Sequence, residues 1–143
     1  MRRIIPLLGI MFLTVGLLLA EDRTIVVVQP FNNTAMLVNS TNYSKALDLN
    51  AYKPNAFTYA LQLKVTNLDV TNVGVVAVSY ELSNDNVDYL SSSNIVTTLS
   101  FTNSPTTGGK GFYQFDAGKS RYIRFKAIVT TTNCWLSGWL AIQ

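Results

Sequence analysis

Apolar and polar residues alternate along most of this chain. In the clearest segment, apolar side chains occupy every second position, at Phe57, Tyr59, Leu61, Leu63 and Val65. Successive side chains of a strand point to opposite faces, so this pattern predicts an antiparallel strand that buries one face and exposes the other. The same period recurs at residues 76–82, more weakly at 95–101, and again at 112–115, 123–129 and 135–142.

Polar turn clusters rich in Asn, Asp, Ser and Gly separate these segments. Two further stretches precede the alternating segments. Residues 24–29 are an apolar strand that Pro30 is expected to end, and residues 32–53 are a polar stretch interrupted by apolar residues 35–38. No convincing helical period appears after residue 20. About eight short strands joined by polar loops predict an all-β protein, a two-sheet antiparallel sandwich of jelly-roll or Greek-key type. A small barrel is the alternative.

The first twenty residues differ from the rest. Arg2 and Arg3 precede an uncharged run at residues 4–20, and a charged triplet follows at 21–23. A helix over this run spans about 26 Å, just short of a bilayer core of about 30 Å. The segment is therefore predicted to be either a signal peptide cleaved after Ala20 or a retained membrane anchor helix. Both alternatives place the remainder outside the cytoplasm, in the extracellular space, at a cell surface or in a virion.

These patterns divide the chain into three parts. Residues 1–20 are the signal peptide or anchor, residues 21–55 an extended strand and polar loop segment, and residues 56–143 the core of the sandwich. Roughly 120 residues suffice for one hydrophobic core and are few for two. Residues 21–143 are therefore expected to form a single folded domain.

Charge argues against a nucleic-acid partner. The chain carries 11 basic and 8 acidic residues, but two of the basic residues are Arg2 and Arg3 in the leader. In the predicted strand near residue 123, alternation places Lys119 and Arg121 on one face and Arg124 and Lys126 on the other. The chain thus lacks the continuous basic stripe that nucleic-acid binding leaves in a sequence.

The residues that carry catalytic chemistry are few. The chain contains no histidine and a single cysteine, Cys134, which excludes Ser-His-Asp and Cys-His arrangements, histidine-ligated metals and an internal disulfide. We therefore predict a protein that is not an enzyme. Asp85 and Asp88 are a weak candidate pair for Ca²⁺, but their Ser-Asn-Asp-Asn context equally predicts a tight turn. No other metal and no cofactor is predicted.

Aromatic residues and asparagines supply the remaining candidates. Trp135 and Trp139 share one face of the last strand, where they either pack within the fold or, with Tyr89, form an exposed aromatic platform for a ligand. Asn32, Asn39 and Asn42 each begin an Asn-x-Ser/Thr sequence. In an exported chain these sequences mark candidate glycosylation sites, and otherwise they are chance matches.

Two segments resemble small β-sandwich modules of phage and virus virion proteins. In residues 78–89 a strand ends in a Ser-Asn-Asp-Asn turn shortly before Tyr89, and in residues 115–125 a later strand begins Arg-Tyr-Ile-Arg. A weaker similarity links the same pattern to discoidin-like carbohydrate-binding domains. The chain departs from the pattern at Asn86, where glycine is usual, and at Tyr89, where tryptophan is frequent. The second departure weakens any transfer of sugar binding.

The resemblance implies a non-enzymatic structural subunit of a virion or extracellular surface assembly. The candidate assembly strand comprises Thr24, Ile25, Val26, Val27, Val28 and Gln29, which could pair with the chain's own sheet or with a neighbour's open edge. The expected partners are further copies or other structural subunits, with a membrane contacted through residues 4–20 if these are retained. The alternative function is a secreted or surface-anchored carbohydrate-binding module, whose partner is a glycan.

Overall fold

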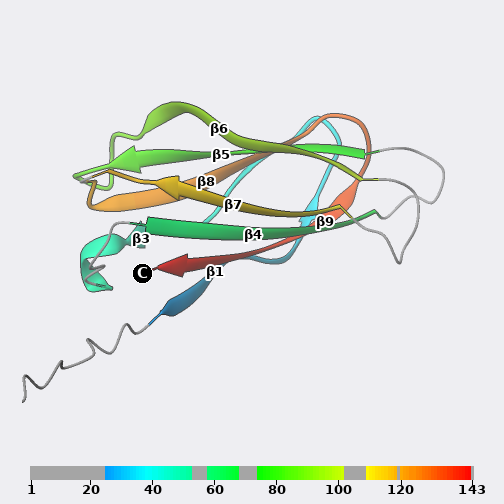
Figure 1. The fold of residues 1–143 in the computed structure, drawn as a ribbon. Coiled ribbons are helices and arrows are strands. Elements are labelled where there is room, and N and C mark those ends of the chain that lie inside the picture. Colours follow the sequence, from blue (N-terminus) through cyan, green and yellow to red (C-terminus); the bar gives the residue numbers. More distant parts are fainter. Residues whose placement is uncertain (1–24, 53–57, 68–73, 102–108, 119, 143) are drawn as a thin grey trace, which may run out of the picture.

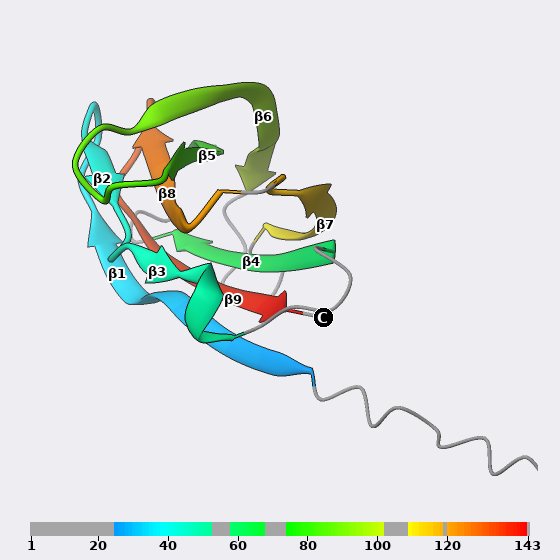
Figure 2. The same cartoon turned by 90° about the vertical axis from the view of Figure 1, so that its left-hand side faces the viewer.

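Two antiparallel sheets pack face to face in the computed structural model of this chain (Figures 1 and 2). The structure describes residues 25–52, 58–67, 74–101, 109–118 and 120–142, with no side-chain detail at residues 67 and 92–101. The predicted leader at residues 1–20, Thr24 and Phe57 lie outside these ranges. Within them, no helix has the length and apolar character needed to cross a membrane. The sandwich, rather than the barrel, is confirmed.

The described residues form nine strands and one short 3₁₀ turn. The strands are β1 (Val26–Met36), β2 (Thr41–Tyr43), β3 (Leu47–Asp48), β4 (Thr58–Asn67), β5 (Gly74–Ser83), β6 (Leu90–Phe101), β7 (Lys110–Asp116), β8 (Tyr122–Val129) and β9 (Cys134–Ile142), and the 3₁₀ turn covers Leu49–Ala51. One sheet has the order β1-β9-β4-β7, and the other β2-β8-β5-β6, with β3 also paired to β8. We refer to them as the four-stranded and the five-stranded sheet.

Strands of the first half of the chain pair with strands of the second half in reverse order. Strand β1 pairs with β9, β2 and β3 with β8, β4 with β7, and β5 with β6, all antiparallel. The β4–β9 and β5–β8 ladders join these nested pairs into the two sheets. The chain is therefore folded back on itself about the β5–β6 connection.

The core lies between the sheets and follows the alternation seen in the sequence. The fully buried side chains include Tyr59, Leu61, Leu63 and Val65 on β4, Val76 and Val78 on β5, Ile123, Phe125, Ala127 and Val129 on β8, and Leu136, Leu140 and Ile142 on β9. Residues between them on the same strands face outward and are exposed or partly exposed. Period two in the sequence thus correctly predicts the inward face of these strands.

Strand β1 is longer than the sequence predicts. It continues through Pro30 to Met36, with register shifts between Val28 and Phe31 and between Phe31 and Thr34. Proline lacks a backbone donor, which ends a central strand but is tolerated at a sheet edge or a bulge. Because β1 is an edge strand, the expected end at Pro30 is wrong, and Phe31 beyond it is buried.

The stretch predicted as a polar loop at residues 32–53 also carries structure. Two leucines, Leu47 and Leu49, are buried and attach this stretch to the core. Between them, Asp48 accepts a hydrogen bond from the backbone N–H of Asn50 at 3.1 Å and forms an ion pair with Arg121 at 3.2 Å. A few apolar anchors are enough to order a mainly polar segment against strand β8.

Candidate functional site: a free strand edge and two outer sheet faces

The first residues of β1 present an apolar edge. Val26, Val27 and Val28 pair with β9, opposite Ile142, Ala141 and Leu140. Strand β1 is the last in the order of its sheet, so within the described residues no strand pairs with its other side. Ile25 and Val27 are 54% and 61% exposed. We call residues 25–28 the apolar edge; they include four of the six residues of the predicted assembly strand, whose first residue, Thr24, lies outside the described ranges.

The apolar edge lacks the features that usually block pairing between sheet edges. Bulges, prolines, charges and short strands all discourage such pairing. The second half of β1 has Pro30, two register shifts and Asn33 at a φ of 47°. Strand β7 begins with Lys110 and ends with Asp116, and β2 has only three residues. Residues 25–28 carry no charge and no bulge, so they are less protected than the second half of β1, than β7 and than β2.

The two tryptophans lie on the outer face of the four-stranded sheet. Cys134, Leu136, Leu140 and Ile142 alternate with them along β9 and are buried in the core. Trp135 and Trp139 therefore point away from the core, where both are partly buried. Placement between the sheets is excluded. Phe112 of β7, which is 62% exposed, lies on the same outer face.

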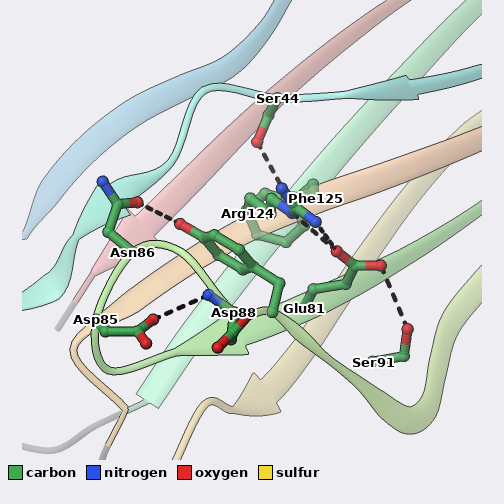
Figure 3. A network of polar contacts seen from close by, with 9 residues as sticks. Ser44, Glu81, Asp85, Asn86, Asp88, Ser91, Arg124 and Phe125 are labelled. Carbon is green, nitrogen blue, oxygen red and sulfur yellow. Dashed lines mark hydrogen bonds and ion pairs between the residues drawn. The ribbon is translucent and has the colours of Figure 1, made fainter.

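Tyr89 lies over the opposite sheet and does not join the tryptophans. The Arg124 guanidinium carbon lies 3.8 Å from the ring centroid of Tyr89 and 4.5 Å from that of Tyr43. Arg124 also donates from Nε to Glu81 Oε2 at 2.8 Å, and Ser91 donates to the other oxygen of Glu81 at 3.3 Å (Figure 3). Because Tyr89 contacts the five-stranded sheet and the tryptophans lie on the outer face of the four-stranded sheet, the predicted three-residue platform is not assembled.

Glu81 and Arg124 form an outer-face cluster that the sequence did not reveal. Alternation places both outside the core, between Tyr80 and Leu82 and between Ile123 and Phe125. Their contact depends on the β5–β8 register, which sets Glu81 directly opposite Arg124. Glu81 is only 5% exposed, and its carboxylate oxygens accept hydrogen bonds from Arg124 and Ser91. The one hint of this cluster in the sequence is Glu81 itself, a single acidic residue at an outward position of a mainly apolar strand.

The loop after β5 is closed by its own hydrogen bonds. Asp85 Oδ1 accepts bonds from Ser83 Oγ at 2.8 Å and from the backbone N–H groups of Val87 at 2.9 Å and Asp88 at 3.0 Å. The two backbone bonds, and then the Ser83 bond, lower the pKa of the Asp85 carboxyl. Asn86 adopts a φ of 63° in the same loop. This is the geometry of the predicted turn. In the described part of the chain, no three acidic or cysteine side chains lie close enough together to hold a metal ion.

The three candidate glycosylation residues lie close together along the chain. Asn32 and Asn39 are exposed, on the bulged part of β1 and in the turn after it. Asn42 lies on β2, is partly buried, and donates to Ser40 Oγ at 3.0 Å. The structure is compatible with sugar at the two exposed positions, and modification of all three stays a prediction.

Comparison with known proteins gives a likeness of fold. The chain matches no protein-family model, and no curated protein matches its sequence. VP2 in the subviral particle of infectious bursal disease virus superposes with a TM-score of 0.52 at 8% identity, over 85% of this chain and 33% of VP2. A chain of the viral particle of the same virus gives 0.49 at 11% identity, over 85% and 32%. YomS, a protein derived from the SPBc2 prophage, gives 0.41 at 10% identity, over 82% and 95%.

The likeness to VP2 confirms the predicted resemblance in fold to a β-sandwich of a virion protein. This chain spans about a third of the VP2 chain. None of the three structures is described as a carbohydrate-binding domain, so the similarity to discoidin-like domains stays a prediction.

Proposed function

We propose that this protein is a non-enzymatic structural subunit of a virion or a comparable extracellular assembly. The observation that carries the proposal is the sandwich shared with VP2, which extends over 85% of the chain. VP2 is described as forming a subviral particle. A sandwich that makes up nearly all of the chain suits a building block, because its edges and faces are its principal surfaces.

The strand order supports a jelly roll, a form used by viral capsid domains. Strands β2 and β3 both pair with β8 and are separated only by residues 44–46, so they act as one interrupted strand. Counted in this way, eight strands form two sheets of four, and the first pairs with the last, the second with the seventh, the third with the sixth and the fourth with the fifth. Such nested pairing is what a long folded hairpin gives when it is rolled into two sheets.

The apolar edge is the surface through which we expect copies to join. Its unpaired N–H and C=O groups can pair with the edge strand of a neighbour, and its apolar side chains then lose contact with water. Antiparallel pairing of two apolar edges would be symmetric and would extend the four-stranded sheet from one copy into the next. The partner in this proposal is a second copy of the chain.

A lysine in the apolar edge tests the assembly. Val27 is 61% exposed in the single chain, so Val27→Lys is expected to fold with an unchanged melting temperature. Charges would meet across a symmetric joint, and we expect the dissociation constant of the assembly to rise at least about tenfold. Light scattering and electron microscopy of purified protein measure this effect.

Val87→Lys is the matched control, because Val87 is 77% exposed in the loop after β5, outside the apolar edge. It should assemble like the unchanged protein. Assembly that survives Val27→Lys, or an unchanged protein that stays monomeric at high concentration, would contradict the proposed use of this edge.

A further inference from the structure

A row of side chains crosses the outer face of the four-stranded sheet. Trp139 on β9 lies opposite Gln62 on β4, and Gln62 lies opposite Phe112 on β7. Neighbouring strands lie about 5 Å apart, so the backbone positions of Trp139 and Phe112 are about 10 Å apart. Two aromatic side chains with an amide between them are thus presented on one outward face.

Two hollows flank Phe112. One, of about 220 Å³, is lined by Ile25, Thr58, Ala60, Phe112, Gln114 and Ala141. The other, of about 410 Å³, is lined by Gln62, Lys110, Gly111 and Phe112. Gln62 and Gln114 are both exposed, and neither side-chain amide bonds to another group in the described part of the chain. Each hollow therefore joins an aromatic surface to an amide that is available to a ligand.

Two lysines stand side by side in the next row. Lys64 on β4 lies directly opposite Lys110 on β7, and both are exposed. Like charges opposed across two strands destabilise a sheet. Among the described residues neither lysine takes part in an ion pair, since the two ion pairs there join Arg121 to Asp48 and Arg124 to Glu81. An anionic group bound between the two ammonium groups would relieve this repulsion.

We propose that this face binds an acidic oligosaccharide, a sugar chain that carries carboxylate or sulfate groups. Phe112 and Trp139 would stack on the apolar faces of sugar rings, and the amides of Gln62 and Gln114 would bond to hydroxyl groups. Lys64 and Lys110 would hold the acidic group. A purely apolar partner would leave the amides and the lysine pair without partners, which is costly once they are shielded from water. The site uses the outer face of the four-stranded sheet and shares only Ile25, which lines the smaller hollow, with the apolar edge.

The test uses three defined hexasaccharides and calorimetric titration. One is a sulfated hexasaccharide prepared from heparin, one a hexamer of galacturonic acid, and one the neutral hexamer of glucose, cellohexaose. We expect at least one acidic probe to bind more tightly than the neutral one, with an affinity that falls as salt screens the lysine pair. The sulfated and carboxylate probes distinguish the two sources of negative charge.

Two variants separate stacking from general attraction of charge. Phe112→Ala removes an exposed ring and should weaken binding about tenfold at every salt concentration. Lys110→Gln should weaken binding mainly at low salt and reduce the dependence on salt. Leu90→Ala and Lys45→Gln are the matched controls, because both residues are exposed on other parts of the molecule and should leave the affinity unchanged.

Three results would overturn the proposal. They are an absence of binding to all three probes, equal binding of acidic and neutral probes, and a loss with Lys45→Gln as large as that with Lys110→Gln. Titration of the unchanged protein below the concentration at which it assembles tests this proposal separately from the proposed assembly.

Discussion

Two core tyrosines share an aromatic neighbour and differ in their hydroxyl groups. Tyr59 and Tyr80 both stack on Phe115, with ring centroids 5.6 Å and 4.8 Å away. Tyr80 donates its hydroxyl to the backbone oxygen of Asp116 at 3.2 Å. The buried hydroxyl of Tyr59 has no partner among the described groups, and burial, followed by the charge of Asp116, raises its pKa. The Tyr80 hydroxyl thus makes a hydrogen bond, whereas the Tyr59 hydroxyl makes none with the described groups.

Removing the two hydroxyls should therefore have opposite consequences. Tyr80→Phe loses its hydrogen bond to Asp116, and we expect it to lower the free energy of unfolding by about 1 kcal/mol. Tyr59→Phe removes an unsatisfied buried polar atom, so its free energy of unfolding should be equal or higher. Urea unfolding at neutral pH measures both. A Tyr59→Phe variant that loses as much as Tyr80→Phe would show that the Tyr59 hydroxyl has a partner in solution.

Cys134 makes the protein sensitive to alkali. Its thiol is fully buried, as expected for a free cysteine in the core, and burial raises its pKa from 9.0 to about 11. The unfolded thiol loses its proton first, so stability is complete below pH 9 and falls as the pH rises towards 11. We expect a loss of about 2 kcal/mol at pH 11 from this group.

The matched comparison is Cys134→Ala. Its free energy of unfolding should fall less than that of the unchanged protein between pH 8 and pH 11, because other alkaline titrations occur in both. A thiol reagent should react with Cys134 only after unfolding. Rapid reaction with the folded protein, or identical pH profiles, would argue against a buried thiol.

At the scale of elements, the contact between Glu81 and Arg124 fastens β5 to β8 on the outer face. Glu81 is almost completely buried, and the Arg124 side chain is 29% exposed. Removing one member of a buried ion pair leaves the other charge uncompensated, whereas replacing both with apolar residues avoids this cost. The pair is therefore expected to matter more when it is half removed than when it is absent.

A double-mutant cycle measures this difference. Arg124→Met should lower the free energy of unfolding by about 3 kcal/mol, and adding Glu81→Met should restore most of the loss. Both variants keep a long side chain over Tyr43 and the neighbouring strand. Additive losses in the double variant would mean that the two residues act independently.

The sequence predicted which face of a strand is buried better than it predicted which strands lie next to one another. In β4 and β8 every second residue is apolar, and the inward rows from Tyr59 to Val65 and from Ile123 to Val129 follow directly. Pro30 was misread because its effect depends on whether β1 is central or at an edge, which the local pattern does not contain. The tryptophans were ambiguous for a related reason: both faces of β9 carry large apolar residues, so alternation does not say which face is inward.

At the scale of the molecule, the sandwich could be predicted from strand number and turn chemistry, but the strand order could not. Period two defines a face and carries no information on which strand lies beside which. The contact of Glu81 with Arg124, and the row of Trp139, Gln62 and Phe112, join residues at least 27 positions apart in the sequence. The Glu81–Arg124 contact and the row of Trp139, Gln62 and Phe112 therefore depend on which strands are neighbours. The apolar edge, in contrast, could be predicted as an uncharged apolar run.

Whether residues 1–20 are cleaved or retained decides whether the protein is expected to be released or held at a membrane. Cleavage after Ala20 would leave only four residues before the apolar edge, and we expect the native protein to begin at Glu21. Intact mass and N-terminal sequencing of native material measure this directly, and added hexose mass would report sugar on Asn32, Asn39 or Asn42. A native chain that begins at Met1 would instead favour a tether to a membrane.

The pairing of the first strand with the last brings distant parts of the chain together. Val26 lies opposite Ile142, so the two ends of the folded region leave the molecule from adjacent positions on one sheet. A short linker could join them, and new termini could be opened in the loop at residues 84–88, giving a circularly permuted protein with the same strand ladders. Peptides fused directly before Val26 and directly after Ile142 would emerge side by side, which would make the folded region a scaffold for displaying paired sequences at a single point on an assembled surface.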